Sequence, residues 1–352
     1  MHDSKASVAM YACPRTGKTL RVCGDFLKAS DGTVVYGMKD GIPQFLRYLP
    51  AEDRETEAQL EALNNLAIEN GWERALAEVY GADQSSIRYV TEPSRASFIG
   101  LLPLNPSSNV LEIGPGLGQF TALLARRVNR VAALEVVAAQ AKFAEQRCRQ
   151  QGLTNIAFAV GGDDCRLPYI DEAFDVVVLN LVFEWCALRC RDEEFSEVQN
   201  RLLSEIARVL KPGGSLYLMT KNRFALRNII GKQDEHCHKV RFGSALPRWL
   251  ATVLMRRKGH ARPMGMLHSH GALKTMLCTA GFRRVNSFWA APEMRYPTYY
   301  VPTDSESIRE ARRNPNFVQG ESRSSRLLMR FIPAPLVKYF TPGLTFLATK
   351  GP

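Results

Sequence analysis

Alternation of apolar runs with amphipathic stretches after residue 108 constrains the fold of this chain more than any other feature. Short apolar runs typical of buried strands alternate there with longer stretches whose apolar residues recur at helical spacing. Strands joined by such helices pair in parallel, so we predict an α/β fold with a doubly wound, mostly parallel, seven-stranded sheet. Ligands of such sheets bind at the carboxyl ends of the strands. We expect strands at 109–113, 130–134, 156–160, 174–179, 215–220, 283–289 and 344–350, and helices at 120–128, 138–150, 193–210 and 271–280.

The chain before residue 100 has a different pattern. Residues 8–48 alternate short apolar runs with Gly, Pro and Asp turn signals, which predicts a small β-rich unit. Residues 52–80 are rich in Leu, Ala and Glu, and their spacing predicts two short helices broken at Gly71. We therefore expect a β-rich domain at 1–50, a helical linker or lid at 51–100, and an α/β domain at 101–352.

Composition limits the partners and the compartment. The chain has 46 Lys and Arg against 35 Asp and Glu, and its net charge of +11 favours acidic partners such as nucleic acid, anionic lipid or phosphorylated metabolites. No apolar stretch approaches the ~20 residues of a spanning helix, and the N-terminus lacks the apolar core of a signal peptide, so we expect a cytoplasmic protein. The eight cysteines are dispersed, which predicts free thiols.

A glycine-rich turn lies between the first expected strand and its helix. It contains Glu112, Gly114, Gly116 and Gly118, and glycines at this position let the backbone approach a ligand. Glu135 ends the next strand, where a carboxylate can accept hydrogen bonds from both hydroxyls of a ribose. The turn is G-x-G-x-G rather than the G-x-G-x-x-G of pyrophosphate sites, and the charge of Glu112 suits a ligand with a cationic amine or sulfonium. A nicotinamide-dependent dehydrogenase is the runner-up.

Three further residues follow the third expected strand. Asp163, Asp164 and Cys165 lie in a turn where carboxylates could bind an adenine amino group. The alternative is that both aspartates only solvate this loop.

The motifs LEIGPGLG, GGDDCRLPYIDEAFDVVVLN and EIARVLKPGGSLYL, in this order over about 109–220, resemble the class I S-adenosylmethionine-dependent methyltransferases. The resemblance implies a Rossmann-like sheet and S-adenosylmethionine as cofactor. It also implies a cofactor role for Glu112, which stands where many members have Asp. The remaining implied contacts are Gly114, Gly116 and Gly118 with the methionine part, Glu135 with the ribose, Asp163 and the Asp164–Cys165 backbone with the adenine, and Asn180 with the methyl donor.

Beyond that core, the chain resembles a narrower group of these methyltransferases, found with genes for lipopolysaccharide and other surface glycans. The matching segments are VVLNLVFEWCAL at 177–188, TKNRFALRNIIGKQDEHCHKVRF at 220–242, HSHGALKTMLCTAGF at 268–282 and FWAAPEMRYPTYYVPTD at 288–304. The resemblance implies a sugar or glycan-linked acceptor and insertions at about 221–268 and 290–342. Lys221 and Cys237-His238 depart from the group's pattern, and a secondary-metabolite acceptor fits nearly as well.

The segment CPRTGKTLRVCGDFLKASDGTVVYGMKDGIPQFL resembles small ribbon domains related to the Trm112 methyltransferase activator. Zinc-binding versions use paired cysteines, whereas this segment has only Cys13 and Cys23, so we expect a metal-free packing or partner-docking module. The histidines at 236, 238, 268 and 270 lack an accompanying ligand pattern, and we expect no metal site.

Asp234 and His236 follow the fifth expected strand, where a general base would meet a bound acceptor. We predict His236 as the base and Asp234 as the residue that orients it; the alternative is that both only order the loop. Residues 241–262 are basic and amphipathic, which indicates a helix with one face on the core and one in solvent or, as the alternative, a helix that binds an anionic membrane or phosphates. We expect residues 323–340 to belong to an insertion between the last two strands that covers the acceptor pocket, with membrane contact as the alternative. An RNA methyltransferase and a non-catalytic partner protein remain as other classes, although no aromatic stacking platform suggests nucleic acid. The oligomeric state is not defined by the sequence.

Overall fold

The computed structural model describes residues 10–47, 54–190, 192–320 and 323–352, and an eight-stranded sheet forms its centre. The strand order is β13-β12-β14-β9-β8-β5-β6-β7, in which the strands from β9 to β7 are parallel and the other pairs are antiparallel. The predicted α/β fold is confirmed, with β13 as a strand that was not expected. The bounds are β5 (Asn109–Ile113), β6 (Arg130–Glu135), β7 (Ile156–Val160), β8 (Phe174–Asn180), β9 (Leu210–Lys221), β12 (Phe282–Ala291), β13 (Tyr299–Pro302) and β14 (Gly343–Lys350).

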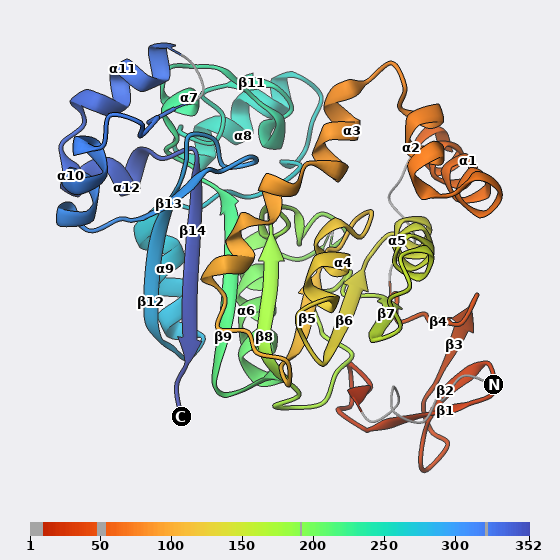
Figure 1. Cartoon of the computed structure of the whole chain (residues 1–352). Coiled ribbons are helices and arrows are strands. Elements are labelled where there is room, and N and C mark those ends of the chain that lie inside the picture. The colour runs from red at the N-terminus through yellow and green to blue at the C-terminus, as the bar shows by residue number, and fades with distance from the viewer. Residues whose placement is uncertain (1–9, 48–53, 191, 321–322) are drawn as a thin grey trace.

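Helices cover both faces of this sheet (Figure 1). Because strand side chains alternate between faces, Leu111 and Val177 pack in one core cluster with α6 and α9, whereas Val110 and Val176 pack in another with α4. Strands that are buried on both faces explain the near-continuous apolar runs of the sequence. The covering helices are α4 (Gln119–Ala125), α5 (Ala138–Gln150), α6 (Phe195–Val209) and α9 (His270–Thr279).

The N-terminal β-rich unit is a four-stranded antiparallel sheet that packs on the main domain. Its strands are β1 (Leu20–Cys23), β2 (Phe26–Ala29), β3 (Val35–Lys39) and β4 (Ile42–Pro43). Tyr11 is buried and stacks on Tyr169 of the main domain at 5.6 Å between ring centroids. The backbone N–H of Phe45 donates to the carbonyl of Val160 on β7 at 2.7 Å. The unit therefore shares a core with the large sheet.

The helical segment that follows contains α1 (Arg54–Asn70), α2 (Trp72–Val79), α3 (Gln84–Thr91) and a 3-10 helix, η3 (Pro93–Leu101). As predicted, the first two helices break at Gly71, whose φ of 88° favours glycine. Leu63 and Leu76 pack on Phe143 of α5. In contrast, α3 has no buried residue, and Asp83 caps it through hydrogen bonds from the N–H groups of Ser85 and Ser86.

Two insertions lie beyond the carboxyl ends of the parallel strands (Figure 1). The first contains α7 (Leu226–Ile229), β10 (Gln233–Asp234), β11 (Val240–Arg241) and α8 (Arg248–Arg257), and the second contains α10 (Ser305–Arg313), α11 (Arg323–Phe331) and α12 (Val337–Phe340). Among the described helices, none has both the length and the apolar character needed to cross a membrane.

Candidate active site

A cavity of about 1050 Å³ lies at the carboxyl ends of β5, β6, β7 and β8. It is lined by the turns after these strands, by α3, and by the loop between β12 and β13. Its volume is at the upper end of the ~300–1,000 Å³ of small-molecule sites, so it has room for a cofactor together with a small acceptor.

The glycine-rich turn lines this cavity through Gly114 and Gly116, both with positive φ. A Cβ on Gly114 would lie 2.5 Å from Val182, whereas a Cβ on Gly116 would meet nothing within 4 Å. Gly118 is different: it does not line the cavity, and a Cβ there would lie 2.8 Å from the Cβ of Ala144 on α5. Close packing of α4 on α5 therefore leaves no room for a side chain at Gly118, and the ligand contact that the resemblance implies for it stays a prediction.

Glu135 lies at the edge of the cavity and is 4% exposed. One carboxylate oxygen accepts a hydrogen bond from the N–H of Gly116 at 3.0 Å, and the other accepts from the N–H groups of Val136 and Val137. Burial raises the pKa of Glu135 despite these three bonds. The carboxylate thus joins the glycine turn to the end of the next strand, at a position where it can reach a ligand.

Glu112 is on β5 and does not line the cavity. It is 2% exposed, and its carboxylate accepts a hydrogen bond from the hydroxyl of Thr121 on α4 at 2.5 Å. Burial raises its pKa to about 7. Glu112 therefore joins β5 to α4, and the cofactor role that the resemblance implies for it stays a prediction.

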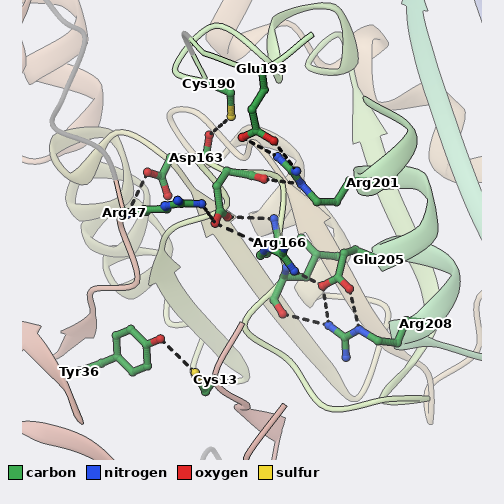
Figure 2. Close-up of polar contacts among 12 residues, drawn as sticks. Cys13, Tyr36, Arg47, Asp163, Arg166, Cys190, Glu193, Arg201, Glu205 and Arg208 are labelled. Carbon is green, nitrogen blue, oxygen red and sulfur yellow. Dashed lines mark hydrogen bonds and ion pairs between the residues drawn. The ribbon is translucent and has the colours of Figure 1, made fainter. Parts of the chain in front are cut away.

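The turn after β7 contains three candidate residues, of which one lines the cavity and two do not. Asp163 lines the cavity, and its carboxylate accepts a hydrogen bond from the N–H of Arg47 at 2.9 Å (Figure 2). Asp164 and Cys165 do not line the cavity. The N–H of Arg166 donates to the Asp164 carboxylate, and Arg201 of α6 donates to the Asp164 carbonyl at 3.0 Å. Arg47 and Arg201, which the sequence did not indicate, therefore hold this turn from two sides.

Asn180 ends β8 and lines the cavity, as expected from its place after the fourth strand. Its side-chain oxygen is buried and accepts no hydrogen bond within the described part of the chain. Glu184, a few residues later, is fully buried and accepts a hydrogen bond from the hydroxyl of Thr220 at 2.7 Å. A buried acceptor without a partner, such as that of Asn180, fits a ligand that supplies the donor.

His236 and Asp234 lie next to the cavity but do not line it. His236 is 2% exposed, and its Nδ1 lies 3.3 Å from the carboxylate of Asp234. Burial disfavours charge on Asp234, but hydrogen bonds from His236 and Ser244 lower its pKa. Trp185 lines the cavity and packs on the His236 ring at 4.5 Å between centroids. In this arrangement the predicted base is separated from the cavity.

The end of the cavity near α3 contains basic and aromatic side chains that sequence reasoning missed. Arg88 and Tyr89 of α3 line it together with Arg295 and Tyr296 of the loop between β12 and β13. The Arg88 guanidinium lies 4.3 Å from the centroid of the Tyr296 ring. Only the motif FWAAPEMRYPTYYVPTD pointed to this loop, and nothing in the sequence placed it beside α3.

The remaining candidate ligands lie in separate places. His268 is 2.7 Å from the side-chain oxygen of Gln199, His270 is 3.0 Å from the hydroxyl of Ser287, and His238 stacks on His260. Within the residues that the structure describes, no three His, Cys, Asp or Glu side chains are grouped to hold a metal ion.

Comparison with known proteins agrees with this geometry. Residues 111–218 match the family model described as a methyltransferase domain. The chain is 33% identical over 176 residues to the biotin biosynthesis bifunctional protein BioHC of Cellvibrio japonicus, covering 48% of this chain and 32% of that protein. It is 30% identical over 115 residues to a malonyl-[acyl-carrier protein] O-methyltransferase of Methylococcus capsulatus, covering 33% of this chain and 38% of that protein. The chain thus spans about a third of the length of these two relatives.

A solved complex of the Haloferax volcanii Trm112 methyltransferase activator with a methyltransferase aligns at 17% identity and a TM-score of 0.44, over 82% of this chain and 98% of the matched chain. The residues present also fit the cofactor that the family model implies. The open space at Gly116, the carboxylate of Glu135 and the free acceptor of Asn180 all face one cavity. Residues 111–218 therefore form a methyltransferase domain, whose cofactor is S-adenosylmethionine.

Proposed function

We propose that the protein transfers the methyl group of S-adenosylmethionine to a hydroxyl or amine of a small biosynthetic acceptor. The observation that supports this most strongly is one cavity with two chemically different groups of lining residues. One group is the glycine turn, Glu135 and Asn180, and the other is the arginine and tyrosine side chains of α3 and of the loop between β12 and β13. A cofactor beside the first group and an acceptor beside the second would meet inside the cavity.

At the cofactor end, each residue has a proposed role that follows from its position. Gly114 and Gly116 let the backbone approach the methionine part, and Glu135 accepts hydrogen bonds from the ribose hydroxyls. Asp163 binds the adenine, and Arg47 holds its carboxylate in place. Asn180 offers its free oxygen beside the methyl donor.

Catalysis in this proposal depends mainly on positioning. The bound cofactor supplies an electrophilic methyl group on its sulfonium. The chain holds the acceptor atom in line with that methyl group, and good orientation lowers a barrier by up to about 7–11 kcal/mol. The aromatic side chains of Tyr89, Trp185 and Tyr296 limit the access of water to the same cavity.

The acceptor that we propose carries an acidic group, because Arg88 and Arg295 line the cavity. The sequence resemblance favours a sugar or glycan-linked acceptor, and the name of one relative, a malonyl-[acyl-carrier protein] O-methyltransferase, favours an acyl group on a carrier protein. A secondary metabolite with an acidic group fits too, and an RNA acceptor fits least, because no stacking platform was recognised in the sequence. The eight free thiols suit a reducing compartment such as the cytoplasm.

We also propose the division of the chain into a Trm112-like ribbon at 1–50, a helical lid at 51–100 and the methyltransferase domain at 101–352. The shared core around Tyr11 favours a packing role for the ribbon. The contribution of α3 to the cavity favours a lid role for the helical part.

Binding of S-adenosylmethionine by calorimetry tests the cofactor end. Glu135→Ala should weaken binding by ~1.5–3 kcal/mol, which is about 10- to 150-fold, because a charged acceptor is lost. S-adenosylhomocysteine should lose the same factor, since the ribose is common to both molecules. Glu69→Ala on the exposed surface of α1 is the matched control and should bind as the wild type does. A wild-type protein that binds no S-adenosylmethionine would overturn the proposal.

The role of His236 as proton acceptor stays a prediction, and so does the role of Asp234 as the residue that positions it. Its Nε2 has no hydrogen-bond partner among the described residues, and the Trp185 ring that packs on it lines the cavity. His236→Ala should leave cofactor affinity unchanged and lower kcat at least ~10²-fold, the range of a general base. Asp234→Asn should shift the pH profile of kcat. If His236→Ala turns over within a few-fold of wild type, the histidine is structural, and Glu184 becomes the next candidate.

A further inference from the structure

The positive charge of the chain is concentrated in the first insertion. Residues 221–264 contain 11 Lys and Arg and only 2 Asp and Glu. The remaining 308 residues contain 35 basic and 33 acidic side chains, so they are close to neutral. Eight of the basic side chains in this insertion are exposed: Arg227, Lys232, Lys239, Arg241, Arg248, Arg256, Arg257 and Lys258. Nearly the whole net charge therefore lies at one end of the molecule.

The same end exposes most of the large apolar side chains. In the described part of the chain, 11 of the 15 exposed large hydrophobic residues fall in 229–264 and 327–339. The most exposed are Phe331 at 76%, Trp249 at 70% and Leu327 at 59%. Isolated exposed apolar residues are common, but a concentration of this kind marks an interaction site.

The two insertions are in contact. Leu226 of α7 packs on the cluster that contains Met329 of α11 and Val337 of α12. In the first insertion, Met255 of α8 packs with Cys237 and Val240. Figure 1 shows α7, α8, β11 and α11 together at the end of the molecule beyond the carboxyl ends of the parallel strands. We call the exposed side chains of 227–264 and 326–339 the basic apolar surface.

We propose that the basic apolar surface docks on anionic lipid headgroups, so that the protein binds a membrane peripherally. Basic side chains are attracted to the surface of an anionic bilayer, and exposed aromatic and aliphatic side chains become buried in its interface. Nucleic acid fits this surface less well, because exposed Ile, Leu and Met side chains gain nothing from phosphates. The inference stands whether or not the proposed acceptor is correct.

Co-sedimentation of the full chain with vesicles tests the proposal. The protein should pellet with phosphatidylcholine vesicles that contain phosphatidylglycerol, pellet poorly with phosphatidylcholine alone, and detach as salt is raised. The variant with Trp249→Ser and Phe331→Ser should bind the anionic vesicles at least tenfold more weakly. Ile68→Ser removes a side chain that is 58% exposed on α1 and should have no effect.

A charge-reversal pair tests the electrostatic part. Arg256→Glu with Arg257→Glu on α8 should abolish vesicle binding, whereas Arg126→Glu with Arg127→Glu, at an exposed position after α4, should change it less than threefold. Unchanged binding of S-adenosylmethionine would show that each variant is folded. Wild-type protein that fails to bind anionic vesicles, or that binds single-stranded RNA in their place, would overturn the proposal. Equal losses in both charge-reversed pairs would overturn it too, because the surface would not be specific.

Discussion

At the scale of single residues, Gly116 is the most sensitive position of the cavity. A side chain on it would extend into the space proposed for the cofactor, because no atom lies within 4 Å of its Cβ position. Gly116→Val should therefore abolish S-adenosylmethionine binding while the protein stays folded. Gly24→Val in the turn between β1 and β2 is the matched control, with a similar φ of 61° and equally open surroundings. Calorimetry and circular dichroism check both variants, and unchanged affinity in Gly116→Val would contradict the site.

Sequence reasoning located the turns of the site more accurately than the directions of their side chains. Gly114 and Asp163 line the cavity, but Glu112, two residues before Gly114, and Cys165, two residues after Asp163, are buried and do not line it. Neighbouring residues on a strand point to opposite faces, so a motif of consecutive residues cannot all reach one ligand. Arg295 was missed for another reason: its place beside α3 depends on the tertiary fold, which spacing along the chain does not encode.

At the scale of elements, the ribbon and the large sheet stabilise each other through their shared core. Tyr11 is buried between Tyr169 and Phe45, so Tyr11→Ala should lower the free energy of unfolding by about 3–5 kcal/mol, as for other large aromatic truncations. The whole molecule should unfold in one transition at lower denaturant. Phe26→Ala, at a ribbon position that is 47% exposed, is the control. A separate early transition for the ribbon, without loss of stability elsewhere, would mean that it is an independent module.

The elements that the sequence predicted well are those with strong periodicity. The bounds of β7 and α5 are those expected, because each has a continuous apolar run or a regular helical pattern. β13 was missed because it is four residues long and ends in Pro302, and prolines normally argue against a strand. It forms because it pairs with β12 at the edge of the sheet, with Trp289 opposite Val301. Long-range pairing of this kind has no local signal.

At the scale of the whole molecule, two buried histidines make stability depend on pH. Burial and nearby positive charges lower the pKa of His268 and of His270 to about 4. Unfolding returns them to about 6.5, so the unfolded chain binds more protons, and stability should fall as pH decreases from about 6.5 to 4. Each histidine contributes roughly 3 kcal/mol to this loss.

Denaturant unfolding at pH 7 and pH 4.5 measures the effect. His268→Gln should lose less stability on acidification than the wild type, because glutamine can still donate to Gln199 but takes up no proton. Glu112, whose pKa is raised to about 7, acts in the opposite direction, and Glu112→Gln should make the acid loss steeper. Equal pH slopes in His268→Gln and wild type would show that His268 titrates normally.

The position of β14 in the sheet has a consequence for biosynthesis. β14 lies between β9 and β12, although it is made after both of them. During translation, one edge of β9 therefore stays unpaired until β14 is made. The segment from β12 to α12 also emerges before the strand that joins it to the sheet. Unpaired apolar edges promote aggregation, and long-range pairings form slowly. The nascent chain should consequently be a client of chaperones at the ribosome until β14 leaves the exit tunnel and closes the sheet.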